Sequence, residues 1–217
     1  MVKIEQWYGG YGERMLFEGF DAIFERGMVT ALSGRSGIGK STLLKAINRL
    51  HEVEERGFVS HGMISVMLDG QMRDITQIDP VMLRRKVGYI FQSPVPLPMS
   101  IEKNVAFGLE IRGIRDQERV ERALRQAYLW EEVKDRLEQR PESLSLGQQQ
   151  RLTIARALVL EPEVLLFDEP TSALDAEATE QIEQLMMRLK KDHTIILVTH
   201  DQGQIERICD KVIKISV

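Results

Sequence analysis

Residues 34–41 constrain the fold of this chain most, because they read Gly-Arg-Ser-Gly-Ile-Gly-Lys-Ser and match the phosphate-loop pattern G-x-x-x-x-G-K-[ST]. Glycines in such a loop let backbone N–H groups close around phosphate oxygens at the start of a helix. An apolar segment, residues 28–32, precedes the loop, and apolar residues recur at helical spacing over residues 40–50. This order of strand, phosphate loop and helix predicts an α/β protein with a mainly parallel sheet.

The side chains at the end of the loop have distinct expected tasks. Lys40 would neutralise the β- and γ-phosphates of a nucleotide, Ser41 would hold Mg²⁺ through its hydroxyl, and Thr42 would support the α-phosphate. The loop residues expected to bind the nucleotide are Gly34, Arg35, Ser36, Gly37, Ile38, Gly39, Lys40, Ser41 and Thr42.

Two adjacent acidic residues, Asp168 and Glu169, follow the continuous apolar run of residues 164–167. Such a run is typical of a parallel strand covered on both faces, and α/β sheets bind ligands at the carboxyl ends of their strands. We therefore expect Asp168 on the metal side of the nucleotide. Glu169 fits a general base that polarises the attacking water, because that task needs a carboxylate close to the γ-phosphate.

A third motif, residues 144–151, reads Leu-Ser-Leu-Gly-Gln-Gln-Gln-Arg. Ser145 and Gln148 have the spacing of a capping box, which would open a helix over residues 147–160. Capping does not account for Gly147, because glycine costs about 1 kcal/mol relative to alanine in a helix. Gly147 therefore predicts that another group closely approaches the backbone of the first turn.

The remaining pattern predicts one domain with three regions. Strands over residues 2–7, 16–24 and 28–32 would form an antiparallel N-terminal layer. Residues 1–92 and 160–217 would form the core with this layer, and residues 93–159 a helical subdomain with helices over 100–112, 116–130 and 131–137. Other expected elements are strands over 63–68, 87–91, 164–167, 194–198 and 212–215, a tight turn at 69–70, and helices beginning at Asp175 and Gln202.

Composition excludes several kinds of site and partner. The formal net charge of -4 offers no basic face for nucleic acid, so no nucleic-acid partner is expected. The longest aliphatic run, residues 195–198, is far shorter than the roughly 18 apolar residues that span a bilayer. The single cysteine, Cys209, rules out an intrachain disulfide and a thiolate zinc site. We expect a soluble, cytoplasmic chain that reaches a membrane only through a partner.

The motifs, taken in order, resemble those of ATP-binding-cassette (ABC) ATPases over essentially the whole chain. Residues 144–148 resemble the family's Leu-Ser-Gly-Gly-Gln signature, except that Leu146 stands where the family has its first glycine. Gln92 resembles the Q-loop glutamine, Asp175 ends a segment that resembles the D-loop, and His200 resembles the switch histidine.

This resemblance implies a P-loop NTPase core of the RecA-like kind, with ATP and Mg²⁺ as cofactors and ATP hydrolysis as the reaction. Tyr11 lies where family members keep an aromatic ring that stacks on adenine, although Trp7 and Tyr8 are close by and could do the same. Beyond the loop, the implied nucleotide-binding residues are Tyr11, Ser145, Gly147, Gln148 and Asp175. The implied catalytic residues are Glu169, His200, Gln92 and Lys40, and the implied metal ligands are Ser41, Gln92 and Asp168.

The resemblance also implies partners. A second copy would bind head to tail, with the signature of one subunit completing the ATP site of the other, and permease subunits would dock near residues 92–115. Residues 87–92, 94–101 and 104–108 resemble the ATPase of bacterial phosphate importers. The chain would then lie on the inner face of the cell membrane, attached through the permease.

Two alternatives remain open from the sequence. The first is an ATPase of the same superfamily with a role outside transport, although such relatives usually need coiled-coil insertions or a second cassette. The second is an ATP-gated dimerisation module whose bulky Leu146 impairs turnover.

Overall fold

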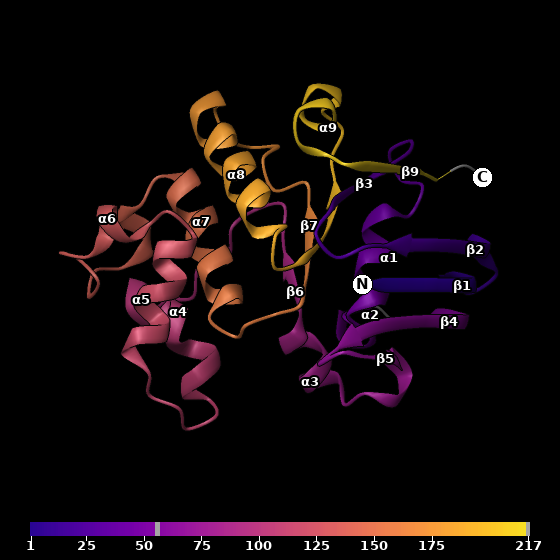
Figure 1. Ribbon diagram of the computed structural model, residues 1–217, viewed down its shortest axis with the longest axis horizontal. Helices are drawn as coiled ribbons and strands as arrows, with labels where there is room; N and C mark the ends of the chain where they lie inside the picture. The colour runs from indigo at the N-terminus through magenta and orange to yellow at the C-terminus, as the bar shows by residue number, and fades with distance from the viewer. Residues whose placement is uncertain (55–56, 216–217) are drawn as a thin grey trace.

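Two β-sheets and a group of helices form the layers of this protein (Figure 1). The computed structural model describes residues 1–54 and 57–215. The antiparallel sheet has the order β2-β1-β4-β5, with β1 (Val2–Tyr11), β2 (Arg14–Phe24), β4 (Phe58–Leu68) and β5 (Gln71–Asp74). The parallel sheet has the order β6-β7-β8-β3-β9, with β3 (Val29–Ser33), β6 (Val87–Ile90), β7 (Val164–Asp168), β8 (Thr194–Val198) and β9 (Lys211–Lys214).

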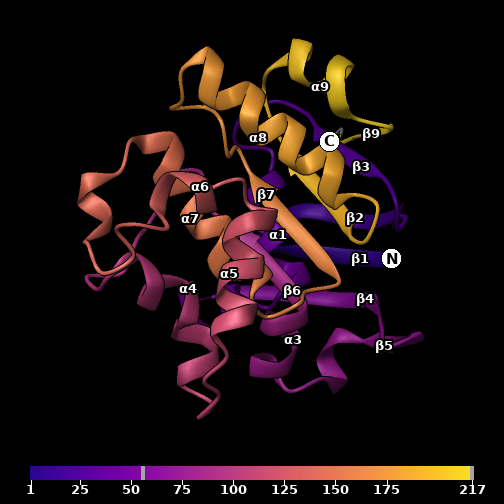
Figure 2. The same cartoon turned by 60° about the vertical axis from the view of Figure 1, so that its left-hand side comes forward.

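The helices are distributed along the whole chain. They are α1 (Lys40–Ile47), α2 (His51–Glu54), α3 (Pro80–Lys86), α4 (Ile101–Glu110), α5 (Gln117–Gln126), α6 (Trp130–Val133), α7 (Leu146–Leu158), α8 (Ala176–Leu189) and α9 (Gln202–Ile208). Short 3-10 turns lie at Ile75–Gln77 and Pro141–Ser143. Figure 2 shows α4 to α7 on one side of β6 and β7, with β1 and β4 on the other side.

The parallel sheet is buried on both faces, as the apolar run of residues 164–167 predicts. In β7, Leu165 and Phe167 pack into a core with the helices, whereas Val164 and Leu166 pack into a core with the antiparallel sheet and α1. Successive side chains of a strand point to opposite faces, so one apolar strand contributes to both cores. The α/β fold predicted from the sequence is therefore confirmed.

One strand lies in a different sheet from the one expected. The prediction that residues 28–32 belong to the antiparallel layer is wrong, because β3 pairs in parallel with β8 and β9. Val29, Ala31 and Leu32 are fully buried, as suits a strand with a core on each face. The place of β3 next to two strands in the sequence is thus a weaker guide to its sheet than its burial on both faces.

The proline-rich loop before α4 is organised by one buried side chain. Asn104, which is fully buried, donates through Nδ2 to the carbonyls of Leu97, Met99 and Ser100, and its Oδ1 accepts from the N–H of Leu97 at 2.7 Å. Because a buried amide needs such partners, Asn104 fixes the path of the loop that leads from β6 to the helices.

Several predicted helix boundaries move for identifiable reasons. The helix expected over residues 116–130 ends at Gln126, because Tyr128 has φ 53°, which no right-handed helix contains. Asp116 and Ser100 cap α5 and α4 through their side chains, in agreement with helix starts at these positions. The expected helix over residues 131–137 is shorter in the structure and corresponds to α6.

Burial of the single cysteine leads to a prediction about its reactivity. Burial and the neighbouring carboxylate of Asp210 raise the pKa of Cys209 to about 11. At pH 8 the thiolate fraction should therefore be about 100-fold lower than for a solvated thiol, since the thiolate is the reactive form. We expect slow reaction with a disulfide reagent in buffer and rapid reaction in guanidinium chloride. Equal rates in both conditions would contradict this environment for Cys209.

Candidate active site

The phosphate loop connects β3 to α1, as the sequence predicts. Gly39, at the N-cap of α1, has φ 107°, a left-handed value that other residues rarely adopt. A Cβ atom at this position would also lie 2.8 Å from the ring of Phe17. Glycine is therefore required here, and the start of α1 offers its first N–H groups to an anion.

Lys40 is the first residue of α1, and its ammonium group points back to the loop. Its Nζ donates to the carbonyls of Gly34 and Arg35 at 2.9 and 3.0 Å, and the residue is 5% exposed. Burial holds the pKa of Lys40 below its usual value, against the opposing attraction of Glu169 and Asp168. A phosphate group entering the loop would supply oxygens in place of these carbonyls and favour the charged lysine.

Asp168 stands at the carboxyl end of β7, next to the start of α1. The hydroxyl of Ser41 donates to Asp168 Oδ1 at 2.9 Å. These residues are 127 positions apart in the chain, and β8 lies between β7 and β3 in the sheet. The parallel order of strands thus brings together the hydroxyl and the carboxylate that the sequence assigns to the metal side.

Glu169 and His200 form a close pair beyond the ends of β7 and β8. His200 Nε2 lies 2.8 Å from Glu169 Oε1, and the two side chains are 45% and 24% exposed. Glu169 has φ 49°, an uncommon value for a residue with a side chain. Strained backbone of this kind concentrates at functional sites. The Glu169 carboxylate can accept a hydrogen bond from a water molecule, and then its proton, while His200 orients the carboxylate.

One open cavity of about 470 Å³ joins the phosphate loop to Glu169 and His200, whereas Asp168 is not among the described residues that line it. It brings together residues from the β1–β2 hairpin, the phosphate loop, and the ends of β7 and β8. Its lining residues are Tyr11, Arg14, Leu16, Ser36, Gly37, Gly39, Lys40, Ser41, Thr42, Glu169 and His200. Tyr11 and six of the nine predicted phosphate-loop residues therefore face one cavity.

Three aromatic residues were possible partners for an adenine ring, and the structure separates them. Tyr11 lines the cavity. Trp7 is 2% exposed and packs against Phe17 with ring centroids 5.1 Å apart. Tyr8 stacks on His61 with a centroid distance of 4.4 Å. Tyr11 is therefore the aromatic residue of the three that a nucleotide in this cavity could reach.

Three predicted loop residues have other roles in the structure. Gly34 and Arg35 meet Lys40 through their backbone carbonyls. The side chain of Ile38 packs against the core beneath the antiparallel sheet. These three residues shape the loop, whereas its other predicted residues face the cavity.

The helix that follows residues 144–145 begins with the predicted capping box. The N–H of Gln148 donates to Ser145 Oγ at 3.3 Å, and the N–H of Ser145 donates to Gln148 Oε1 at 2.9 Å. Leu146 is the first residue of α7 and is 42% exposed. The surface at the start of α7 therefore carries an apolar side chain.

The close approach that Gly147 predicts is present within the same chain. A Cβ atom on Gly147 would lie 2.7 Å from the Cβ of Ala178 in α8. Such a distance is too short for two carbon atoms, so α7 and α8 can cross here only with glycine at position 147. Packing inside the subunit is thus sufficient to explain this glycine.

Four predicted residues lie away from the cavity of their own chain. None of Ser145, Gly147, Gln148 and Asp175 is among the described residues that line it. Asp175 caps α8, because its Oδ1 accepts from the N–H of Ala178 at 2.8 Å. These positions can contact a nucleotide only if that nucleotide is held by another molecule.

Gln92, predicted as a metal ligand and catalytic residue, has a different partner in this structure. Its Nε2 donates to Ser172 Oγ at 3.1 Å, and the residue is exposed. Ser172 Oγ in turn donates to the carbonyl of Glu169 at 3.1 Å. Gln92 is therefore linked to the acidic segment through Ser172 and is not among the described residues lining the cavity.

Sequence reasoning missed three residues close to the site. Arg14 and Leu16 line the cavity from the start of β2. The hydroxyl of Tyr89 in β6 donates to Asp168 Oδ2 at 2.7 Å. The turn after Tyr11 could have indicated Arg14, because residues on either side of a tight turn are neighbours. Tyr89, in contrast, reads in the sequence as an ordinary strand residue.

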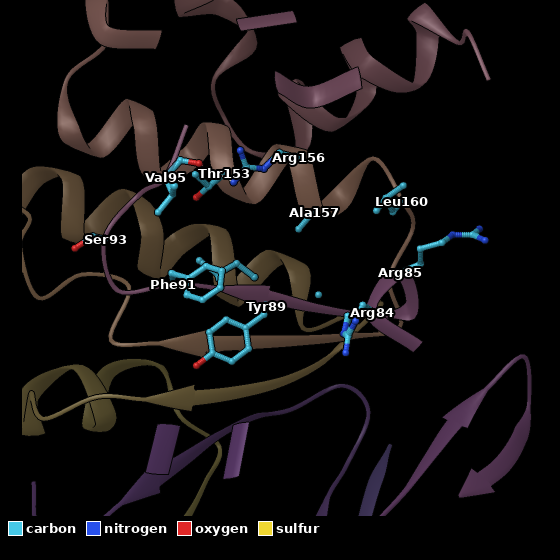
Figure 3. A pocket seen from close by; sticks show the side chains of 12 residues that line it. Arg84, Arg85, Tyr89, Phe91, Ser93, Val95, Thr153, Arg156, Ala157 and Leu160 are labelled. Carbon is cyan, nitrogen blue, oxygen red and sulfur yellow. Dashed lines mark hydrogen bonds between the residues drawn. The ribbon is translucent and has the colours of Figure 1, made fainter. Parts of the chain in front are cut away.

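A second, smaller cavity of about 260 Å³ lies where β6 and the loop after it face α7. Figure 3 shows Arg84, Tyr89 and Phe91 on one side of it, with Thr153 and Arg156 on the helix opposite. Val95 and Phe91 are 56% and 40% exposed. This groove combines apolar and cationic side chains at the junction of the core and the helices.

Comparisons with known sequences identify the family. The family model described as ABC transporter matches residues 17–172. A phosphate import ATP-binding protein PstB from Salinibacter ruber is 48% identical over 212 residues, which cover 97% of this chain and 84% of that protein. A second protein of this name, from Alcaligenes faecalis, is 50% identical over 204 residues, covering 92% of this chain and 70% of that protein.

Solved structures give the same result. The structure of cbiO1 from Clostridium perfringens, part of the ABC transporter complex cbiONQ, has a TM-score of 0.81 and 30% identity, covering 98% of this chain and 83% of that chain. An ATP-binding subunit of an ABC transporter has a TM-score of 0.79 and 29% identity, covering 99% and 85%. Among residues 1–54 and 57–215, no helix combines the length and the apolar character that crossing a membrane requires. The chain therefore belongs to the ABC transporter family, as an ATP-binding subunit with ATPase activity.

Proposed function

We propose that this subunit hydrolyses Mg²⁺-bound ATP as a head-to-tail dimer and thereby drives a permease that imports phosphate. The cavity that joins the phosphate loop to Glu169 and His200 is the observation that carries the proposal. The names of the two relatives support phosphate as the solute. They also disfavour a role outside transport. Residues 93–159 would form the helical subdomain, and residues 1–92 with 160–217 the core.

ATP would lie with its phosphates in the loop and its adenine against Tyr11. The N–H groups at the start of α1 and the ammonium of Lys40 would neutralise the phosphates. Ser41 and Asp168 fit Mg²⁺, because this ion prefers oxygen ligands and usually takes one or two protein groups together with the phosphates. When bound, Mg²⁺ would stabilise charge on the γ-phosphate. Gln92 would become a ligand of Mg²⁺ only after its hydrogen bond to Ser172 breaks.

Glu169 would act as the general base. A water molecule between its carboxylate and the γ-phosphate would give a proton to Glu169 as its oxygen attacks the γ-phosphorus. The bond from that phosphorus to the bridging oxygen would break, and ADP and phosphate would leave. His200, 2.8 Å from Glu169 Oε1, would keep that carboxylate in place and could then turn toward the γ-phosphate.

The second copy would supply what the cavity lacks on its open side. The start of α7, with the Ser145 hydroxyl and Gln148, would donate to the γ-phosphate held by the partner, and Asp175 would lie nearby in the interface. The hydroxyl of Ser145 accepts a hydrogen bond from its own helix and keeps its proton to donate. Two ATP molecules would then join the two subunits.

The permease would dock in the groove between β6 and α7 shown in Figure 3. Exposed Phe91 and Val95 offer apolar contacts to it. Docking there would hold the subunit on the cytoplasmic face of the membrane. The experiment that tests the proposal is reconstitution of the subunit with its co-purified permease in proteoliposomes. We expect ATP-dependent phosphate uptake, and ATPase activity without phosphate uptake would reject the assigned solute.

The exposed leucine of the signature leads to a separate prediction. Leu146 contributes little to its own core, since it is 42% exposed at the start of α7. We therefore expect Leu146→Gly to leave the ATPase rate equal or higher, because the smaller residue gives a partner's nucleotide more room. A large loss of activity in steady-state assays would mean that the leucine is an adaptation that turnover needs.

A further inference from the structure

The carboxylate of Asp168 is held by two hydroxyl groups from different elements. Ser41 donates to Oδ1 at 2.9 Å, and Tyr89 donates to Oδ2 at 2.7 Å. Hydrogen bonds from a hydroxyl to a carboxylate are strong and directional, so the two donors together fix the plane of the carboxyl group. Ser41 belongs to the phosphate loop, whereas Tyr89 belongs to no motif of the site.

The sheet explains why Tyr89 reaches this group. Tyr89 pairs with Leu166 across the parallel strands β6 and β7. Side chains two residues apart on a strand share a face, so Asp168 projects from the same face as Leu166. The long side chain of Tyr89 therefore runs along this face toward Asp168. In Figure 3 its hydroxyl points away from the helix that carries Arg156.

We propose that Tyr89 is a positioning residue, whose hydroxyl holds the Asp168 carboxylate in the orientation that receives Mg²⁺ together with ATP. This inference rests on the proposed function, because it concerns the same metal site. Groups that hydrogen-bond to a metal-binding carboxylate orient it and tune its affinity, and their loss commonly costs about 10-fold or more in metal binding.

Tyr89 also connects the site to the groove in which we place the permease. It is among the residues lining that groove, and its ring centroid lies 4.7 Å from that of Phe91. The carbonyl of Phe91 accepts from Gln150 Nε2 in α7 at 3.0 Å. A molecule bound in the groove against Phe91 would therefore lie next to the ring that packs on Tyr89, the residue that holds Asp168.

The test removes one hydroxyl and measures metal binding directly. Tyr89→Phe keeps the ring and its packing but leaves Asp168 Oδ2 without this donor. Binding of Mn²⁺, as a probe for Mg²⁺, would be followed by the electron paramagnetic resonance signal of free Mn²⁺ in the presence of a non-hydrolysable ATP analogue. We expect about tenfold weaker Mn²⁺ binding, with unchanged analogue binding in EDTA. Tyr128→Phe, the same change at a hydroxyl that contacts Arg188, is the matched control and should bind Mn²⁺ like wild type.

The outcomes separate the inference from the proposed function. If wild-type protein binds Mn²⁺ with the analogue and Tyr89→Phe binds it equally well, the positioning role is wrong. If wild-type protein itself binds no Mn²⁺ with the analogue, the metal site of the proposed function is wrong. A purely structural role for the hydroxyl would lower the melting temperature of Tyr89→Phe and leave its Mn²⁺ affinity unchanged.

A measurement on wild-type protein makes the test independent of the variant. The chain has four tyrosines, so ring-labelled tyrosine gives few nuclear magnetic resonance signals. Adding Mg²⁺ to protein already saturated with the analogue should shift the Tyr89 ring signal more than that of Tyr128. Equal shifts at both residues would overturn the inference.

Discussion

Glu169→Gln should slow ATP hydrolysis by at least about 100-fold while leaving ATP affinity close to that of wild type. Glutamine keeps the size and the polarity of the side chain but cannot accept the proton of the attacking water. The phosphate loop and Lys40 are untouched by the change, so the nucleotide should still bind. Steady-state ATPase assays and equilibrium binding of a fluorescent ATP analogue would give the two values.

The control for this prediction is another glutamate changed in the same way. Glu161 pairs with Arg119 and Arg122 and is 61% exposed in its side chain. Glu161→Gln should hydrolyse ATP at the wild-type rate. Wild-type turnover by Glu169→Gln would show that some other group is the base, whereas loss of binding would show that Glu169 supports the fold of the site.

Gly147→Ala should lower the free energy of unfolding by about 1–3 kcal/mol, the usual cost of overpacking a close contact. The added Cβ would lie 2.7 Å from the Cβ of Ala178, so α7 and α8 would have to separate. Thermal melting of the variant would reveal this loss. Because α7 carries the signature at its start, the ATPase rate should fall with it.

A second change tests whether packing is the cause. Ala178→Gly removes the opposing carbon, so Gly147→Ala with Ala178→Gly should recover stability relative to Gly147→Ala alone. Ala178→Gly by itself should cost about 1 kcal/mol, the usual price of glycine in a helix. A stable Gly147→Ala variant that lacks activity would instead mean that the partner's nucleotide needs the glycine.

The fold was predictable where the pattern of apolar residues is strong. Residues 164–167 are apolar throughout and form a strand buried on both faces. The strand expected over residues 63–68 is present but begins earlier, at Phe58, because the first six residues of β4 are not buried and show no apolar alternation. The strand β5 is mostly exposed and was not predicted. The helix α3 was missed although Asp79 caps it and Pro80 starts it, both of which are recognisable signals.

The site was predictable to the extent that each residue belongs to a local motif. Lys40, Ser41 and Glu169 follow from short patterns and do face one cavity. Tyr89 and Arg14 do not belong to such patterns, because their proximity to the site comes from strand register and hairpin geometry. A hairpin turn after Tyr11 could have indicated Arg14, but the pairing of β6 with β7 that places Tyr89 leaves no trace in a single sequence.

The claim that one subunit completes the ATP site of the other is tested most directly by the mass of the protein in solution. By light scattering, Glu169→Gln should have the 24.9 kDa mass of one chain without nucleotide and twice that mass with Mg²⁺ and ATP. Leu146→Glu in this background places an acid in the first turn of α7, which suits its own helix but repels a partner's γ-phosphate.

We predict that Glu169→Gln with Leu146→Glu binds ATP and stays at the mass of one chain, whereas Glu169→Gln with the neutral Leu146→Gln doubles its mass. Equal doubling by both double variants would contradict an ATP-mediated interface at the start of α7.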